Sequence, residues 1–518
     1  MKIKYIAIFL VLLCCIMGAA SAAEDISTDI VSDSVDDAVV VDAVQEEIDD
    51  TTIDTVTNVP DDTNLEEIEE NINTDEISEE SAIVDSEPTR ATSVTVSDWG
   101  DLNTYCTKNS PQTIYLNGAI YATSGITIKN SATIIGNPGS YITGGTNGVT
   151  YFKSTGDLSI SFVNVTFKDM HAGVLIKLDT VTGTNRFINC SFDNIYTSVY
   201  KSSVIWNDNG TMNISGCNFT NCNDGFGTIT NFATNGTVRM NVENCRFENN
   251  TARVEPGAIN NCGDLNVTNS NFTNNKAFQW AGAIHTHTNA STRIIGSIFT
   301  DNLAGSGTLG WNGGALFSYG TLEVMNSVFN DNYCHVGTGG GAIFGYSYAG
   351  STYNITVDSC NFTRNINNYT GGYAGAIGVQ NIGYLTVFNS IFINNAADNG
   401  QAIAAITKDE PYCLNCTNCS CPNCPNCTNC SHNVSTGNPT TKIFNNTFIN
   451  HTGSGDTVVI AGNHYLFENN TFINSTQNTI YNGSGNNYTP PASPLSYVPQ
   501  TRANSKLGAS KWDCPIIV

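Results

Sequence analysis

Short stretches of alternating apolar and polar residues recur along most of the chain, separated by turns rich in glycine and asparagine. The segments Leu265-Asn266-Val267 and Leu322-Glu323-Val324 are typical. Alternation with a period of two is typical of half-buried strands, whereas an amphipathic helix repeats its apolar positions every three or four residues. The pattern therefore predicts a chain of many short β-strands.

One phenylalanine recurs in a constant context, as in NCSFDNI, NSNFTNN and NSIFINN. Neighbouring copies are about 24 to 33 residues apart, except for one interval of 56. A period of this size, with short strands between polar turns, predicts a β-solenoid in which each repeat forms one coil and equivalent residues stack. The repeated residues are Phe167, Phe192, Phe219, Phe247, Phe272, Phe299, Phe329, Phe362, Phe392, Phe448 and Phe472.

A second motif follows six of the phenylalanines by about ten to fifteen residues and reads GAI, GGAL or GGAI. It begins at Gly257, Gly282, Gly313, Gly340 and Gly375, with QAI at Gln401 as a variant. The small alanine allows the backbone to turn closely, and glycine permits a positive φ at such a turn. The motif is therefore expected to mark a bend in each coil.

Two positions beside each phenylalanine are restricted. The second residue after it is asparagine or aspartate in every copy except Arg364, and stacked asparagines at a turn can bond to each other and to nearby backbone. The second residue before it is serine or cysteine through the middle repeats, which predicts an internal ladder of small side chains. Neighbours in this ladder, such as Cys190 and Cys217, are also close enough in a stack for disulfides. The fold class predicted is all-β, a right-handed parallel β-helix (a pectate-lyase-like solenoid) of about a dozen coils.

The start of the solenoid is expected to be covered. In residues 93–160, Trp99, Leu102 and Cys106 fall on one face of a short helix that begins after Ser97 or Asp98. A solenoid exposes core residues and unpaired strand edges at its end, so an amphipathic helix is the expected N-terminal cap.

Charge and hydropathy divide the rest of the chain. Residues 1–22 read as an export signal, with an uncleaved N-terminal anchor as the alternative. Residues 23–92 are strongly acidic and lack aromatics, which predicts a disordered spacer. Residues 161–487 carry the repeats, and 488–518 form an irregular tail without them. The body is nearly neutral and has no basic face, which argues against a nucleic-acid partner.

A cysteine-rich insertion, residues 411–438, accounts for the long interval between phenylalanines. Repeated C-x-x-C spacing brings thiolates together with little loss of chain entropy, because each loop is short. It suits zinc or another thiophilic metal, to which His432 could add a ligand. The alternative is a surface loop held or cross-linked by disulfides, in which the odd count leaves one thiol for a partner chain. The cysteines are Cys413, Cys416, Cys419, Cys421, Cys424, Cys427 and Cys430.

Other candidates for chemistry are fewer. His285 and His287 lie two apart after a GAI motif and would share one strand face, as a metal site or as a polar surface pair. A β-helix lyase needs carboxylates and a base on neighbouring coils of one face. The charged residues of neighbouring coils do not line up in the repeat, so no catalytic residue is assigned. These residues are Asp224, Glu243, Glu248, Asp264, Arg239, Arg246 and Arg253.

The pair of motifs GGA[I/L] and F-x-x-N resembles the repeat of chlamydial polymorphic outer-membrane proteins, as in Gly340-Gly341-Ala342-Ile343 and the sequences FTNN, FENN and FINN. With the export signal and acidic spacer, the chain is most similar to adhesin-like surface proteins of methanogenic archaea. That resemblance implies display outside the cell and attachment to host or microbial surfaces. The chain departs from the chlamydial pattern in the cysteine-rich loop, and its mode of anchoring is left open.

Two functions are compatible with these features. The first is an extracellular or cell-surface adhesin that binds carbohydrate or protein. The second is a polysaccharide lyase or glycoside hydrolase on the same scaffold. Carboxylates converging on one groove would favour the enzyme, and aromatics on an acid-poor side, such as Trp206, Trp280, Trp311 and Tyr348, would favour binding.

Overall fold

The structure of the chain is a computed structural model. It describes residues 92–198, 202–232, 238–305, 312–335, 337, 339–347, 353–380, 383–406, 441–461, 465–476 and 479–481. The predicted export signal, nearly all of the acidic spacer, the cysteine-rich insertion and the tail lie outside these residues.

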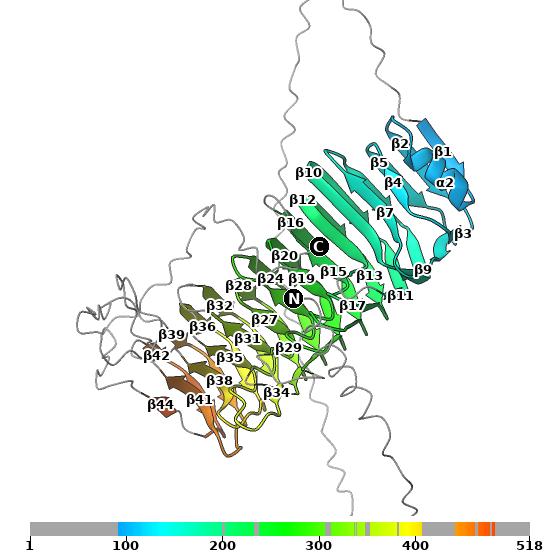
Figure 1. Cartoon of the computed structure of the whole chain (residues 1–518). Coiled ribbons are helices and arrows are strands. Elements are labelled where there is room, and N and C mark those ends of the chain that lie inside the picture. Colours follow the sequence, from blue (N-terminus) through cyan, green and yellow to red (C-terminus); the bar gives the residue numbers. More distant parts are fainter. Residues whose placement is uncertain are drawn as a thin grey trace, which may run out of the picture. The chain divides into compact units, whose positions relative to one another are not determined.

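The described residues form a right-handed parallel β-helix of about 11 turns, as the repeat predicts (Figure 1). Every named strand pair is parallel, and each strand pairs with the equivalent strand of the next coil. A coil in the middle of the stack has three main strand ladders, here called the GAI, middle and Phe ladders, and a fourth ladder of two-residue strands. The first coils use longer strands, because β10 (Val174–Ile188) and β12 (Ile205–Ser215) run through both the GAI and middle ladders.

The earlier strands are β1 (Thr92–Val96), β2 (Gln112–Leu116), β3 (Ala119–Ala122), β4 (Ile126–Ile128), β5 (Ala132–Gly136), β6 (Tyr141–Gly144), β7 (Thr150–Thr155) and β8 (Ile160–Val163). The GAI ladder contains β15 (Ile229–Asn231), β19 (Ile259–Asn261), β23 (Ile284–Thr286), β27 (Leu316–Ser318), β31 (Ile343–Tyr346), β35 (Ile377–Gln380), β38 (Gly400–Ile406), β41 (Asp456–Ala461) and β44 (Thr479–Tyr481). The middle ladder contains β16 (Val238–Glu243), β20 (Asp264–Thr268), β24 (Ser291–Ile295), β28 (Thr321–Met325), β32 (Asn354–Asp358), β36 (Tyr384–Phe388), β39 (Thr441–Phe444) and β42 (Tyr465–Glu468).

The Phe ladder contains β9 (Thr166–Ala172), β11 (Ser191–Thr197), β13 (Asn218–Thr220), β17 (Arg246–Glu248), β21 (Asn271–Thr273), β25 (Ile298–Thr300), β29 (Val328–Asn330), β33 (Asn361–Thr363), β37 (Ile391–Ile393), β40 (Thr447–Ile449) and β43 (Thr471–Ile473). Two-residue strands follow it, namely β14 (Asn223–Asp224), β18 (Thr251–Ala252), β22 (Lys276–Ala277), β26 (Leu303–Ala304), β30 (Tyr333–Cys334) and β34 (Ile366–Asn367).

The repeated phenylalanines stack inside the helix. Phe272, Phe299 and Phe329 are in register, with ring centroids 4.7 and 4.8 Å apart and rings within 3° of parallel. The residue two after each phenylalanine has a left-handed backbone in all eleven copies, as at Asn274 (φ 53°). The residue three before it does as well, as at Asn269 (φ 48°). Asparagine tolerates this conformation better than most residues, which explains why it flanks the phenylalanine on both sides.

The predicted cysteine and serine ladder lies inside the coil. The backbone N–H of Cys190 donates to Sγ of Cys217, and Cys217 donates in the same way to Cys245. The chain of bonds continues through Ser270 and Ser297. The three cysteines are buried free thiols, so these side chains act as hydrogen-bond acceptors and are not cross-linked.

A second buried ladder lies one residue beyond the left-handed turn, and it was not predicted from the sequence. It consists of Asn250, Asn275, Asn302, Asn332, Asn365 and Asn395. The Nδ2 of Asn302 donates to Oδ1 of Asn332 in the next coil and to the carbonyl of Phe272, at 2.9 Å each. Oδ1 of Asn302 accepts from the backbone and side-chain N–H groups of Asn275. The turn's buried backbone groups are thereby paired.

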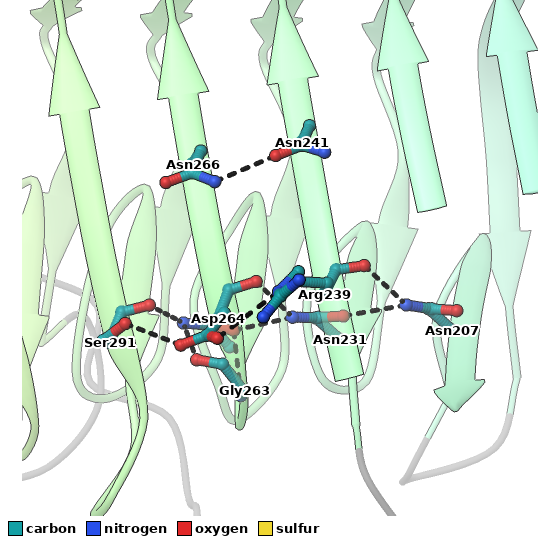
Figure 2. Close-up of polar contacts among 9 residues, drawn as sticks. Asn207, Asn231, Arg239, Asn241, Gly263, Asp264, Asn266 and Ser291 are labelled. Carbon is teal, nitrogen blue, oxygen red and sulfur yellow. Dashed lines mark hydrogen bonds and ion pairs between the residues drawn. The ribbon is translucent and has the colours of Figure 1, made fainter. Parts of the chain in front are cut away.

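We expect Asn302→Ala to lower the free energy of unfolding by about 2–3 kcal/mol, because it leaves the backbone N–H of Asn275 buried without its acceptor and removes a donor to the carbonyl of Phe272. The control is Asn266→Ala, which removes a half-buried bond between Asn266 and Asn241 on the outside of the coil and should have less than about 1 kcal/mol of effect (Figure 2). Chemical denaturation of both variants tests this, and equal losses would contradict it.

The glycine of the GAI motif serves a different purpose from the one predicted. Gly257, Gly282 and Gly375 do not have positive φ. A Cβ on Gly282 would lie 2.2 Å from the carbonyl oxygen of Gly314 in the next coil. Close stacking of successive coils, and not a left-handed turn, therefore requires glycine here.

The N-terminal cap is present as predicted. Helix α2 (Trp99–Cys106) starts at Asp98, whose side chain accepts a hydrogen bond from the N–H of Asp101. Trp99, Leu102 and Cys106 are buried in the core of the first coils. In the described part of the chain, no helix has the length and apolar character needed to cross a bilayer.

Candidate functional site

The outward side of the GAI ladder is a second buried surface. Ile259, Ile284 and Leu316 point into the coil and belong to the main core. The next residue on each strand must point outward. Asn260, His285 and Phe317 occupy that position in register, yet all three are buried. This outer face is therefore covered by other parts of the chain.

The covering residues come from the turns that precede the GAI strands. Glu255 stands just before Gly257 in the turn that leads to β19, and Trp280 stands just before Gly282 in the turn that leads to β23. Since these turns vary in length and sequence between coils, each coil can present different chemistry over the same strand position.

His285 and His287 share one face of the chain, as predicted from their spacing, with ring centroids 4.1 Å apart. Sequence reasoning found no third group, but the fold supplies Glu255 from the preceding coil. Its Oε2 lies 2.7 Å from Nδ1 of His285 and 3.8 Å from Nε2 of His287. The relative exposures are 8% for Glu255, 1% for His285 and 3% for His287. A carboxylate and two imidazoles are thus buried together.

Two neighbours hold the histidines in place. Nε2 of His287 lies 2.7 Å from Oδ1 of the buried Asn260. The indole of Trp280 stacks on the His285 ring, with centroids 5.5 Å apart and 13° between planes. The imidazoles are therefore fixed between a polar side and an aromatic side.

Trp280 has an unusual backbone for a bulky residue, with a φ of 65°. The left-handed region is unfavourable by about 1–2 kcal/mol for a residue with a Cβ. Its N–H donates to Oδ1 of Asn312 at 2.8 Å, and its carbonyl accepts from Gly313 at 2.8 Å, so the next coil holds it there. Such strain at a partly exposed aromatic residue is a feature of binding sites.

An outer aromatic cluster extends from Trp280 toward the C-terminal coils, separate from the main core. Phe317, Tyr319 and Phe344 are its buried members. Trp280, Tyr346 and Tyr373 are partly buried and pack against them. Trp280 lies 5.2 Å from Phe317, and Phe317 lies 5.7 Å from Phe344, measured between ring centroids.

The outer face is polar toward the N-terminal coils. Lys177 and Trp206 are in register there, and the Lys177 ammonium pairs with Asp208 at 3.0 Å. Asn209 donates to Asp179 at 2.8 Å. The same face therefore passes from an ion-pair region to an aromatic region, with the Glu255–His285–His287 group between them in the order of coils.

The charged residues considered for lyase chemistry lie in separate places. Arg239 pairs with Asp264 across the outside of β16 and β20 (Figure 2). Arg246 pairs with Glu248 on one strand of the Phe ladder, and both point outward. Glu243 is exposed at the end of β16. These side chains do not converge with Glu255.

Asp224 is the exception among them, because it is completely buried. Thr197 donates a hydrogen bond to its Oδ1 at 3.0 Å. Burial raises the pKa of Asp224 to about 7, against the opposing effects of hydrogen bonding and of the Arg253 charge. The group is therefore partly protonated at neutral pH.

The metal ligands predicted at Cys413, Cys416, Cys419, Cys421, Cys424, Cys427 and Cys430, with His432, lie outside the described residues, and so do Trp311 and Tyr348. The metal or disulfide role of that loop remains a prediction. Burial raises the pKa of the described thiols Cys106, Cys334 and Cys360 to about 12. These three are protonated at neutral pH, and thiols are poor metal ligands.

No protein-family model and no curated protein matches the chain. Among solved structures, it is similar to the PL6 family alginate lyase AlyGC, with 13% identity and a TM-score of 0.33 over 69% of this chain and 51% of the lyase. It is also similar to a mannuronic acid-specific polysaccharide family 6 lyase from human gut microbiota (12%, TM-score 0.25, covering 73% and 82%). A third is the A-module of the Azotobacter vinelandii mannuronan C-5 epimerase AlgE4 (11%, TM-score 0.24, covering 73% and 91%). The chain spans about half the length of AlyGC, and these likenesses concern the fold alone.

Proposed function

We propose that this protein is displayed outside the cell and binds a polysaccharide through the outer face of the GAI ladder. The observation that carries the proposal is Trp280, which is held in a left-handed conformation on top of the outer aromatic cluster and is partly exposed. The apolar face of a sugar ring packs on such an aromatic ring, and the burial of both surfaces favours binding.

The cluster has the composition of a ligand site. Tyr346 and Tyr373 are partly buried like Trp280, so each combines apolar ring surface with a polar tip. Sites of this type pair aromatic walls with a few fixed polar groups. A stack of parallel coils repeats these elements at a regular spacing of about 4.8 Å, which suits a polymer better than a small molecule.

Display outside the cell rests on the sequence. The predicted export signal and acidic spacer would carry the solenoid away from the membrane, and the repeats resemble those of adhesin-like surface proteins. The proposal therefore makes this chain an adhesin-like protein whose ligand is a carbohydrate of a host or microbial surface. A protein ligand is the alternative outcome of a binding test.

Trp280→Ala is expected to weaken binding about 10- to 50-fold, the usual size of effect for an aromatic anchor worth about 2 kcal/mol. The test is the affinity of the full chain for a panel of purified polysaccharides, including uronic-acid polymers and neutral glucans. Tyr346→Ala should weaken the same interaction. The matched control is Tyr384→Ala, because Tyr384 is 45% exposed on the middle ladder, away from the cluster.

Equal loss in Tyr384→Ala, or no binding to any member of the panel, would refute the proposal.

A second candidate function is that of a polysaccharide lyase or hydrolase. One observation favours it, the 2.7 Å contact of Glu255 with His285, since a carboxylate can orient a histidine as a general base. Chain cleavage of a bound polysaccharide, abolished in His285→Gln but kept in Trp280→Ala, would establish the enzyme instead.

A further inference from the structure

We propose that Glu255, His285 and His287 form a Zn²⁺ site that fastens the turn before β19 to the next coil. This inference is independent of the proposed function. One donor atom from each of the three residues, a carboxylate oxygen and two imidazole nitrogens, lies within 4.8 Å of the other two. The three come from two coils, Glu255 from the turn before β19 and the histidines from β23 and the residue after it.

The distances suit zinc after small side-chain rotations. Zinc lies about 2.0–2.2 Å from nitrogen and carboxylate oxygen ligands in a tetrahedron, which places the donor atoms roughly 3.3–3.6 Å apart. Oε2 of Glu255 is 2.7 Å from the His285 nitrogen and 3.8 Å from the His287 nitrogen. These two distances lie on both sides of the required one, so each needs to change by less than about 1 Å.

The donor set selects the metal. Calcium and magnesium are bound mainly by oxygen, with six or more ligands for calcium. Two imidazoles and one carboxylate form a common zinc ligand set that leaves a fourth position. Oδ1 of Asn260, 2.7 Å from Nε2 of His287, is a neutral oxygen that would fill that position. The buried Nδ2 of Asn260 has no hydrogen-bond partner within the described residues, so only the contact of Oδ1 with His287 opposes a rotation of the amide toward a metal.

Burial indicates a structural role for this metal. The three ligands are at most 8% exposed, and Trp280 and Phe317 cover the His285 ring at 5.5 and 5.2 Å. A catalytic zinc needs an open position that substrate can reach, whereas a structural zinc is closed. A buried carboxylate charge is unfavourable in surroundings of low polarity, and a divalent ion would neutralise it. Zinc here would join two coils directly beneath Trp280.

The first experiment must separate this site from the cysteine-rich loop, which could itself bind zinc. We would replace all seven cysteines from Cys413 to Cys430 with serine in the full chain and measure zinc by mass spectrometry after equilibration with Zn²⁺. One zinc per chain is expected. X-ray absorption should show nitrogen or oxygen at about 2.0–2.1 Å and no sulfur at about 2.3 Å.

The ligand variants His285→Gln, His287→Gln and Glu255→Gln are expected to weaken zinc binding at least about 100-fold in that background, more than is usual for residues outside the first ligand sphere. His335→Gln is the control, because His335 is exposed on a later coil and should leave the affinity unchanged. Zinc should also raise the melting temperature of the chain that lacks the seven loop cysteines, and this increase should disappear in Glu255→Gln.

Glu255→Gln keeps the size of the side chain and decides the question if a histidine variant does not fold. The proposal would be overturned by any of three results: no zinc bound to the chain that lacks the seven loop cysteines, a spectrum with sulfur ligands only, or a Glu255→Gln variant that retains full affinity.

Discussion

Phe299→Ala should lower the free energy of unfolding by about 3–5 kcal/mol, the largest effect of any single substitution considered. Phe299 is completely buried and stacks between Phe272 and Phe329 at 4.7 and 4.8 Å. Removing the ring leaves a cavity that the rigid stack cannot close, because each neighbouring ring is held in register by its own coil. Denaturation by urea, followed by circular dichroism, would measure the change.

The matched control is Phe278→Ala, which removes the same side chain from a position that is 41% exposed. Its expected effect is below about 1 kcal/mol. In a solenoid each coil contacts only its neighbours, so loss at Phe299 should also open the middle of the stack before the ends. Equal effects of the two substitutions would mean that the aromatic stack contributes little to stability.

The repeat made the fold predictable because each coil uses the same local devices. The period of the phenylalanines gave the register, and the asparagines two residues after them marked a turn that is left-handed in all eleven copies. The ladder of Cys190, Cys217 and Cys245 was also predictable, because only small side chains recur there. Local chemistry repeated in sequence was sufficient for these features.

Other features depended on contacts that one repeat does not show. The second asparagine in sequences such as FTNN indicates the buried ladder through Asn302. Our interpretation of the sequence considered only the first asparagine, which lies at the turn. The sequence analysis attributed the glycine of the GAI motif to a positive φ. The structure shows that glycine is needed because a Cβ at Gly282 would lie 2.2 Å from a carbonyl oxygen of the next coil. Both require knowing how coils stack.

For the same reason, only the two histidines of the candidate site could be predicted from the sequence. His285 and His287 share a face because strand residues alternate, and their spacing shows this. Glu255 is 30 residues from His285 in the sequence and lies in a turn whose length differs between coils. Whether Glu255 comes close to His285 depends on how that turn folds over the outer face, and the repeat pattern of the sequence does not predict this.

Asp224→Asn should stabilise the protein above neutral pH, because Asp224 is buried with its pKa raised from 3.8 to about 7. A group whose pKa is higher in the folded state binds more protons there, so its contribution to stability is full below pH 3.8 and is lost as pH rises through about 7. A shift of this size corresponds to about 4 kcal/mol at most. Asparagine mimics the neutral acid at every pH and avoids this loss.

The measurement is the difference in free energy of unfolding between Asp224→Asn and the unchanged protein, by chemical denaturation at pH 4.5 and pH 8. We expect a gain of at most about 1 kcal/mol at the lower pH, where the unfolded carboxyl is already partly ionised, and of about 2–4 kcal/mol at the higher one. Taking the difference removes the opposite effect of His451, whose pKa burial lowers to about 4, because that residue is present in both proteins. Asp157→Asn, a substitution at the surface, controls for the loss of one negative charge. A difference that does not change with pH would show that Asp224 is not protonated in the fold, and the buried carboxylate would then have to be held by the Arg253 charge and the Thr197 hydroxyl.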